Sequence, residues 1–300
     1  MQVTQAMIDT PYAAHEALVA PCRPRQALWR MLLGLVIVSV TLFAGYTVVW
    51  RALAAGSHEL AMSFITGDSA PGLLMLLASF GFMILGVTLA VRQLQRRSLQ
   101  SVTGDRRLMI RQFWQVFRLL VLMMLAIFVL PPYGFGAPLT PNLTFSAWLF
   151  LLPLSLLAVL IQVSAEEILF RGYLQQSLAA RFRSPLIWML VPSILFAFGH
   201  YSPEQAGENT LLVVALTGLF GLLMADITAR AGTLGPAIAL HFTNNVLALL
   251  IVGFPDMLSG LALYLTPFDM SDTGALRLWL LVDLVMMVCA WLVARIGLRR

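Results

Sequence analysis

The sequence predicts an all-α, polytopic membrane protein with about eight transmembrane helices and both termini in the cytoplasm. Composition is the first reason: 60% of the 300 residues are hydrophobic and 11% are charged, whereas a soluble domain carries about 25% charged residues. The second is that apolar runs long enough for a helical span, about 20 residues, recur along the chain. The third is that arginines concentrate in every second connection between those runs.

The chain is predicted to be a short tail followed by one membrane domain. Residues 1–26 lack the basic start and apolar core of a signal peptide, so we expect a cytoplasmic N-terminal tail, which Pro21 and Pro24 would keep loosely ordered. Residues 27–300 show no repeat or low-complexity linker and are predicted to form a single transmembrane helical domain. The predicted spans are approximately 28–50, 71–91, 114–131, 147–165, 185–200, 210–229, 236–254 and 275–296.

Charge sets the predicted orientation. All 19 basic residues are arginines, and the formal net charge is +5. Arginines gather at both chain ends and in connections such as 92–113 and 171–184, while the intervening connections carry acids such as Glu59, Glu204 and Asp256. Because arginine-rich loops stay in the cytoplasm, both termini are placed there. Topology accounts for the positive charge, so no nucleic-acid partner is expected.

Two adjacent glutamates and an arginine follow the fourth apolar run, Ala147 to Val163. A charge at bilayer depth costs a few kcal/mol and usually marks function. Glu167 and Arg171 are four residues apart, so on a helix they can pair. Glu166 points about 100° away from Glu167. We therefore expect Arg171 to neutralise Glu167 and to leave Glu166 free for another partner.

Two further polar motifs lie in the fifth and seventh predicted spans. His200 ends the fifth span four residues after Phe196, and His241 and Asn245, also four residues apart, share one face of the seventh. A single histidine or asparagine in a membrane helix is most often a hydrogen-bonding contact between helices. Polar motifs converging in the fourth, fifth and seventh spans favour a functional site instead.

Other polar residues receive structural interpretations. Asp226 and Arg230 are four residues apart at the inner end of the sixth span and are expected to pair. His15 and His58 lie in the tail and in a loop, where we expect solvation. Asp283 lies inside the eighth span without a predicted partner.

The three motifs resemble the signature of the CPBP family, which comprises the CAAX prenyl proteases and bacteriocin-processing or immunity relatives (the ABI group). Order and residue types match over 165–245, and the remaining chain matches by topology alone. In order, the motifs are Glu166-Glu167-x-x-x-Arg171, Phe196-x-x-x-His200 and His241-x-x-x-Asn245.

The resemblance implies an intramembrane endopeptidase that hydrolyses a peptide bond of a membrane-associated peptide or protein. Glu166 matches the catalytic glutamate, with His200 as its partner in activating water. His241 and Asn245 match the pair that stabilises the oxyanion. Peptide hydrolysis needs such a base and such donors. The supporting residues that the resemblance implies are Glu167, Arg171 and Phe196.

A metal-dependent reaction is an alternative for the same residues. Glu166, His200 and His241 would supply one carboxylate and two imidazoles, a ligand set that catalytic zinc uses with one open position. The chain contains no His-Glu-x-x-His helix motif. The resemblance admits a metalloprotease or a glutamate protease, so a divalent metal such as zinc stays an open expectation.

Residue counts along the predicted helices place the Glu166 and His200 motifs at the same level. Glu166 to Arg181 is 15 residues, or about 22 Å of helix. Ser184-Pro185 is a natural break, and Pro185 to His200 is again 15 residues. If the two segments fold back on each other, His200 returns to the level of Glu166, and the site lies near the cytoplasmic side.

Two other functions compete with proteolysis. A transporter would use buried acids and histidines as an ion relay, although no inverted repeat is visible. A non-catalytic immunity or scaffold protein would use the same fold to bind a partner. For the protease, the expected partners are the lipid bilayer and a peptide or protein substrate. The absence of lysine is in keeping with a bacterial source, and the expected location is the cell (inner or plasma) membrane.

Overall fold

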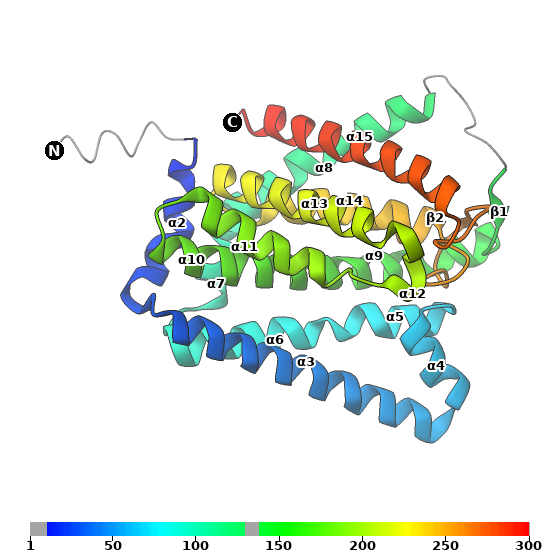
Figure 1. Ribbon diagram of the computed structural model, residues 1–300, viewed down its shortest axis with the longest axis horizontal. Coiled ribbons are helices and arrows are strands. Elements are labelled where there is room, and N and C mark those ends of the chain that lie inside the picture. The colour runs from blue at the N-terminus through cyan, green and yellow to red at the C-terminus, as the bar shows by residue number, and fades with distance from the viewer. Residues whose placement is uncertain (1–10, 130–137, 300) are drawn as a thin grey trace.

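The computed structural model describes residues 11–129 and 138–299, which form a bundle of helices running mostly along one long axis (Figure 1). Residues 1–10 of the predicted tail and the last residues of the third predicted span lie outside these ranges. The first described segment, near residue 11, and the end of the last described helix, near residue 298, lie at the same end of the bundle (Figure 1). We call this end the inner end and the opposite end the outer end.

Helices make up nearly all of the described structure. The α-helices are α2 (Glu16–Val19), α3 (Leu28–Gly56), α4 (His58–Thr66), α5 (Ala70–Ser79), α6 (Gly81–Ala90), α7 (Leu99–Thr103), α8 (Arg106–Val129), α9 (Phe145–Glu167), α10 (Gln175–Arg181), α11 (Pro185–Phe198), α12 (Pro203–Ala206), α13 (Thr210–Ala231), α14 (Gly235–Val246) and α15 (Thr273–Leu298). Short 3₁₀ segments cover Ala13–His15, Ala20–Arg25 and Gly207–Asn209. π-helical turns cover Val91–Gln95, Ile168–Leu174 and Leu247–Ile251.

The all-α prediction is correct except for three strands of two residues each in the described part of the chain. β1 (Thr140–Pro141) pairs antiparallel with β3 (Tyr264–Leu265), and β3 pairs parallel with β2 (Val252–Gly253). The side-chain amide of Asn142 donates to the Ser259 and Ala262 carbonyls at 2.8 and 2.9 Å. This small sheet lies at the outer end, where it joins the segment before α9 to the loop after α14 (Figure 1).

The predicted number of spans is confirmed only in part. Within the described residues, six helical segments are long and apolar enough to cross a membrane, and two apolar helices are shorter. The shorter ones are Pro185–Phe198 and Gly235–Ile251, where the fifth and seventh spans were predicted. At 1.5 Å per residue, the 14 residues of α11 extend about 21 Å, less than the roughly 30 Å of hydrocarbon in a bilayer.

Helix ends follow local chemistry. The Thr144 hydroxyl caps α9 by accepting from the Ala147 amide, and the Asp272 carboxylate caps α15 by accepting from the Ala275 amide at 3.0 Å. α13 ends at Gly232, whose φ of +71° is a left-handed conformation that favours glycine.

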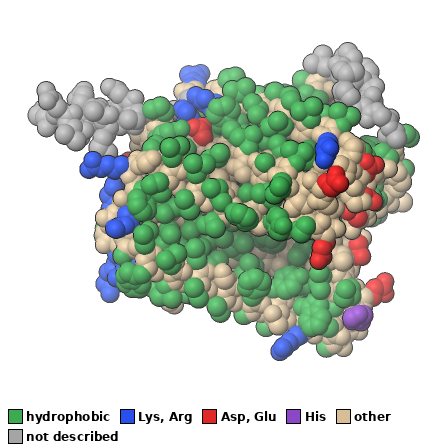
Figure 2. Space-filling model, viewed as in Figure 1, with side chains coloured by type: hydrophobic (Ala, Val, Ile, Leu, Met, Phe, Trp, Pro, Cys, Tyr) green, Lys and Arg blue, Asp and Glu red, His purple; other side chains and the backbone are tan. Residues whose placement is uncertain are grey.

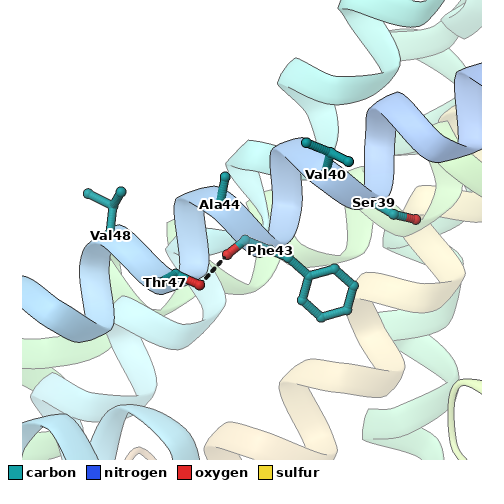
Figure 3. A pocket seen from close by; sticks show the side chains of 6 residues that line it. All are labelled: Ser39, Val40, Phe43, Ala44, Thr47 and Val48. Carbon is teal, nitrogen blue, oxygen red and sulfur yellow. Dashed lines mark hydrogen bonds between the residues drawn. The ribbon is translucent and has the colours of Figure 1, made fainter.

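One face of α3 shows what the outer surface of the bundle is made of. Val40, Phe43 and Val48 point away from the neighbouring helices (Figure 3), and they are 61%, 69% and 66% exposed. Gly86 of α6 packs against the opposite face, where an added Cβ would lie 2.8 Å from the Val38 Cα. Large apolar side chains thus face outward, as a lipid environment requires, and small residues lie at the helix contact.

Most charged side chains on the face shown lie towards the two ends of the bundle (Figure 2). In that view arginines cluster around the end that holds the termini, and acidic side chains cluster at the other end. A broad apolar band separates them. This separation is the pattern expected of a multi-pass membrane protein.

The prediction of a loosely ordered tail is wrong for residues 11–25, which form short helical segments packed on the bundle. Leu18 and Cys22 are buried, and His15, expected to be solvated, is only 4% exposed. The His15 ring lies 4.8 Å from the Trp188 ring of α11. The prolines suggested disorder, but Pro21 occupies the first turn of a 3₁₀ segment, where its missing N–H costs nothing.

The predicted pair of Asp226 and Arg230 is confirmed, and it anchors this N-terminal segment. Arg230 Nε lies 2.9 Å from each Asp226 carboxylate oxygen. The Tyr12 hydroxyl donates to Asp226 at 2.9 Å, and the Trp291 indole N–H of α15 donates to it at 3.0 Å. One carboxylate therefore joins the N-terminal segment, α13 and α15.

Acidification is expected to release the N-terminal segment. Burial lowers the pKa of His15 to about 4, from about 6.5 in an unfolded chain. The docked form therefore excludes a proton that the undocked form binds, and docking weakens as the pH falls from 6.5 towards 4, by about 3 kcal/mol in all. Hydrogen-exchange protection factors of residues 11–25, corrected for intrinsic rates, should fall between pH 7.5 and pH 4.5.

The matched controls replace one histidine each. His15→Phe keeps an aromatic ring against Trp188 and removes the titrating group, so its protection should vary little with pH. His58→Phe, at an exposed histidine, should behave as the wild type. Equal pH dependence in His15→Phe and the wild type would contradict the role given to His15.

Candidate active site

Glu166 and Glu167 lie at the end of α9, where the hydrogen-bonding pattern of the helix changes. α9 runs directly into the π-helical turn Ile168–Leu174 and then into α10, so residues 145–181 form one helical segment of 37 residues. A π turn bonds residue i to i+5 and is frequent at functional sites. Here the turn carries Arg171. The prediction that 166–181 is helical is confirmed.

One carboxylate oxygen of Glu167 joins two motifs. Arg171 Nη1 donates to Glu167 Oε1 at 3.0 Å, and His241 Nδ1 lies 2.8 Å from the same oxygen. Glu167 and Arg171 are 0% and 1% exposed, and His241 is 3% exposed. Burying a charge is tolerable only when it is paired and hydrogen-bonded. The expected Glu167–Arg171 pair is confirmed, and the contact with His241 of α14 was not predicted.

Arg171 also holds α11 and α13 beside the glutamates. Its Nη2 donates to the Gly221 carbonyl of α13 at 3.3 Å, and its Cζ lies 4.9 Å from the centre of the Phe196 ring. An added Cβ at Gly221 would lie 2.9 Å from the Ser193 Cβ, so only glycine allows α11 and α13 to approach this closely. The arginine of the first motif thus contacts the helix that carries the second.

Glu166 remains outside the Arg171 network, as expected, and faces His241. Glu166 Oε2 lies 3.4 Å from His241 Nε2, and the Glu166 side chain is 12% exposed. This oxygen is buried and accepts no hydrogen bond from the described residues. The two adjacent glutamates therefore approach the two nitrogens of one imidazole ring.

The His241 contacts define its protonation. A carboxylate only accepts, so Nδ1 carries the proton that is shared with Glu167, and Nε2 of a neutral ring presents a lone pair to Glu166. The cluster thus places one guanidinium and one imidazole against two carboxylates, and these contacts lower the cost of burying the charges.

His200 lies at the exposed end of α11, next to this cluster. Its Nδ1 is 2.9 Å from the Phe196 carbonyl oxygen, which only accepts, so Nε2 of the neutral ring is left unprotonated. The Phe196 ring is centred 4.7 Å from the His200 ring and 6.1 Å from the His241 ring. It also contacts Phe170, 5.2 Å away, as the predicted fold-back of α10 and α11 requires. No hydrogen bond joins His200 to Glu166 among the described residues.

Asn245 lies one helical turn beyond His241 and bonds back to α9. Its Nδ2 donates to Gln162 Oε1 at 2.8 Å, and its Oδ1 accepts from Asn244 Nδ2 at 3.3 Å. Gln162 is 6% exposed and lies one turn before Glu166. Gln162 was not among the predicted site residues, although a polar residue four positions before Glu166 in an apolar run is a usable signal.

A second π-helical turn, Leu247–Ile251, begins two residues after Asn245. α9, which carries Glu166 and Glu167, and α14, which carries His241 and Asn245, therefore both change from α to π hydrogen bonding at their ends, at Ile168 and Leu247. The regular α-helical hydrogen-bonding pattern of α9 and that of α14 thus both end beside the site.

The proposed metal ligands do not gather around one point. Across residues 11–129 and 138–299, no three His, Cys, Asp or Glu side chains lie close enough together to hold a metal ion. Glu166 and His241 approach each other, but His200 does not complete the set and instead bonds to the Phe196 carbonyl. Glu166, His200 and His241 thus do not surround one point in this arrangement, and the zinc alternative stays a prediction.

Fold and site together define a multi-pass helical membrane protein with a buried cluster of glutamate, arginine and histidine. Residues 142–247 match a family described as "Type II CAAX prenyl endopeptidase Rce1-like". This match confirms the resemblance to the CPBP family seen in the three motifs, and it supports a CAAX-protease-like enzyme. The matched stretch contains the helices from α9 to α14 and every predicted site residue.

One curated relative is similar over part of its length. "Uncharacterized protein YyaK" of Bacillus subtilis (strain 168) is 28% identical over 170 residues, which cover 55% of this chain and 56% of that protein. The chain thus spans little more than half the length of this relative. No solved structure matches the chain.

Removal of the buried arginine is expected to destabilise the bundle. Arg171→Met leaves the Glu167 carboxylate buried with only His241 as its partner, and loss of one member of such a pair costs about 3–5 kcal/mol. A fall in the midpoint of thermal unfolding in detergent should report the loss. The double variant Glu167→Gln, Arg171→Met should recover a large part of it, since no unpaired charge remains.

Arg277→Met is the matched control, because its pair with Glu208 is exposed, at 57% and 80%. It should cost less than about 1 kcal/mol. If Arg171→Met shifted the midpoint no more than Arg277→Met, the Glu167–Arg171 pair would not be a main support of the site.

Proposed function

We propose that the protein is an intramembrane endopeptidase that hydrolyses a peptide bond of a membrane-associated peptide or protein without a metal. The observation that supports this most directly is the cluster of Glu166, Glu167, Arg171 and His241 between α9 and α14, with Phe196 and His200 beside it. The cluster lies within the segment that matches the Rce1-like family.

In this proposal Glu166 acts as the general base. Its partly exposed carboxylate takes a proton from a water molecule while the water oxygen attacks the peptide carbonyl carbon. The same carboxyl then returns the proton to the amide nitrogen as the carbon–nitrogen bond breaks, giving a carboxylic acid and an amine, and the acid releases its remaining proton to solvent. His200, with Nε2 unprotonated, accepts a hydrogen bond from the second O–H of the water and holds the water in place.

The opposite side of the carbonyl is assigned to α14. The negative charge on the carbonyl oxygen needs preformed donors. A protonated His241 supplies Nε2–H, and Asn245 supplies the N–H that Gln162 does not use. Glu167 and Arg171 support these groups without contact to the substrate, because Glu167 holds the His241 ring through Nδ1.

The site is proposed to face the cytoplasm. Glu166 lies 21 residues after Phe145, the first residue of α9, a distance of about 32 Å along the helix, which equals the thickness of the hydrocarbon layer. If α9 begins at the outer membrane surface, Glu166 lies at the inner surface. The arginines gathered at the inner end (Figure 2) support this orientation. A multi-pass location in a bacterial cell membrane is part of the proposal.

Peptidase activity of the purified protein tests the proposal. We expect wild-type protein in detergent to cleave members of a quenched fluorescent peptide library. Glu166→Ala should lose activity by at least about 10³-fold and His200→Ala by about 10²-fold, because each removes a group that acts on the water. A chelator should leave the wild-type rate unchanged.

Each outcome discriminates between alternatives. Activity that a chelator abolishes and zinc restores would favour the metal-dependent reaction. Equal cleavage by wild type and both variants would point to a different site or a contaminant. Absence of cleavage together with uptake of an ion driven by a gradient in proteoliposomes would favour transport, and partner binding that survives Glu166→Ala and His200→Ala would favour a scaffold.

Orientation is tested separately by cysteine labelling in intact cells. In a Cys22→Ala, Cys289→Ala background, Ser271→Cys at the outer end should react with a membrane-impermeant maleimide. Ser184→Cys, in the arginine-flanked turn before α11, should react only after the cells are opened. The reverse pattern would place the termini and the site on the other side of the membrane.

A further inference from the structure

Gln162 of α9 is a polar side chain near the proposed site to which the proposed reaction gives no part. It is buried, at 6% exposed, and lies in an apolar stretch of a helix long enough to cross a membrane. An amide in such a place is costly unless it is hydrogen-bonded. Its described partner is Asn245, whose Nδ2 lies 2.8 Å from Gln162 Oε1.

The Gln162–Asn245 hydrogen bond is one of the side-chain contacts between α9 and α14 at the site. Another is between Glu166 and His241, with 3.4 Å between Oε2 and Nε2. Gln162 comes four residues before Glu166, and Asn245 comes four residues after His241, so the two contacts lie one helical turn apart. The helices run antiparallel at this point. Glu166, the proposed base, and Asn245, a proposed oxyanion donor, therefore lie on different helices and one turn apart.

The bonds to the Asn245 amide leave one donor for a substrate. Asn245 Oδ1 accepts from Asn244, and one hydrogen of Nδ2 is donated to Gln162. An asparagine amide has two N–H donors, so the second hydrogen stays available, and its direction is determined by the bond to Gln162. Without that bond only the longer contact with Asn244, at 3.3 Å, restrains the terminal torsion of Asn245, which is broad for an asparagine.

We propose that Gln162 is a positioning residue that orients Asn245 towards the oxyanion of the reaction. The inference rests on the proposed peptidase function and adds a residue outside the three motifs to the groups on which the rate depends. A simple contact between helices would hold α9 and α14 together without affecting the transition state. The two interpretations therefore differ in kinetics and in binding of a transition-state mimic.

The test compares Gln162→Met with the wild type. Methionine keeps the length and volume of glutamine and removes the acceptor. We expect kcat to fall by about tenfold or more, since small misplacement of a catalytic group has effects of this size, while KM stays within about twofold. Binding of a phosphinate peptide, whose tetrahedral oxygens mimic the oxyanion, should weaken by a similar factor.

A double variant shows whether Gln162 acts through Asn245. Asn245→Ala alone should lower kcat by about 10²-fold or more, as loss of an oxyanion donor does. Adding Gln162→Met to Asn245→Ala should then cause no further loss in kcat or in phosphinate affinity. If the two losses multiply, Gln162 acts independently of Asn245 and the inference is wrong.

Gln112→Met is the matched control for stability. Gln112 is also a buried glutamine between helices, donating to the Ala231 carbonyl at 3.1 Å and accepting from the Thr233 hydroxyl at 2.5 Å. Both variants should lower the unfolding midpoint, but only Gln162→Met should lower kcat. Equal kcat in the two variants would overturn the inference while wild-type cleavage and its loss in Glu166→Ala uphold the proposed function. Absence of wild-type cleavage would overturn both.

Discussion

The Glu167 carboxylate is the interaction on which the described site depends. It lies in the interior of the bundle with no exposed surface, and one of its oxygens meets both Arg171 and His241. A charge there is stable only with such partners. Arg171 in turn holds the Gly221 carbonyl and the Phe196 ring. One buried charge thereby determines the relative positions of α9, α11, α13 and α14, and a residue with no proposed contact to substrate organises those that have one.

Much of this arrangement was predictable from the sequence because charged residues are costly in an apolar helix. The Glu167–Arg171 pair, the helical course of 166–181, the break at Ser184-Pro185 and the return of the next helix followed from spacing alone. The eight apolar segments were also located, although only six helices within residues 11–129 and 138–299 are long and apolar enough to cross a membrane. Hydropathy reports where a helix is apolar and does not report whether it extends through the bilayer.

What the sequence did not reveal depends on contacts between distant segments. His241 bonds to Glu167 across 74 positions, and spacing rules apply only within one helix. Burial of His15 depends on Trp188, 173 positions later, so composition alone suggested a solvated tail. Gln162 was overlooked because glutamine carries no charge and attracts less notice than a glutamate, although its cost in an apolar helix rests on the same unmet hydrogen bonds.

The π-helical turn Ile168–Leu174 has a consequence for comparing this chain with others. Bonding from i to i+5 fits one more residue into a turn than the α pattern does. A helical wheel that starts at the beginning of α9 therefore assigns residues to the wrong faces after Ile168. The faces of α10 must be counted afresh from Gln175. A relative with an unbroken α-helix here would be one residue shorter. The gap in a correct alignment falls inside the turn, and misplacing it by a few positions would pair Arg171 with a residue on a different face.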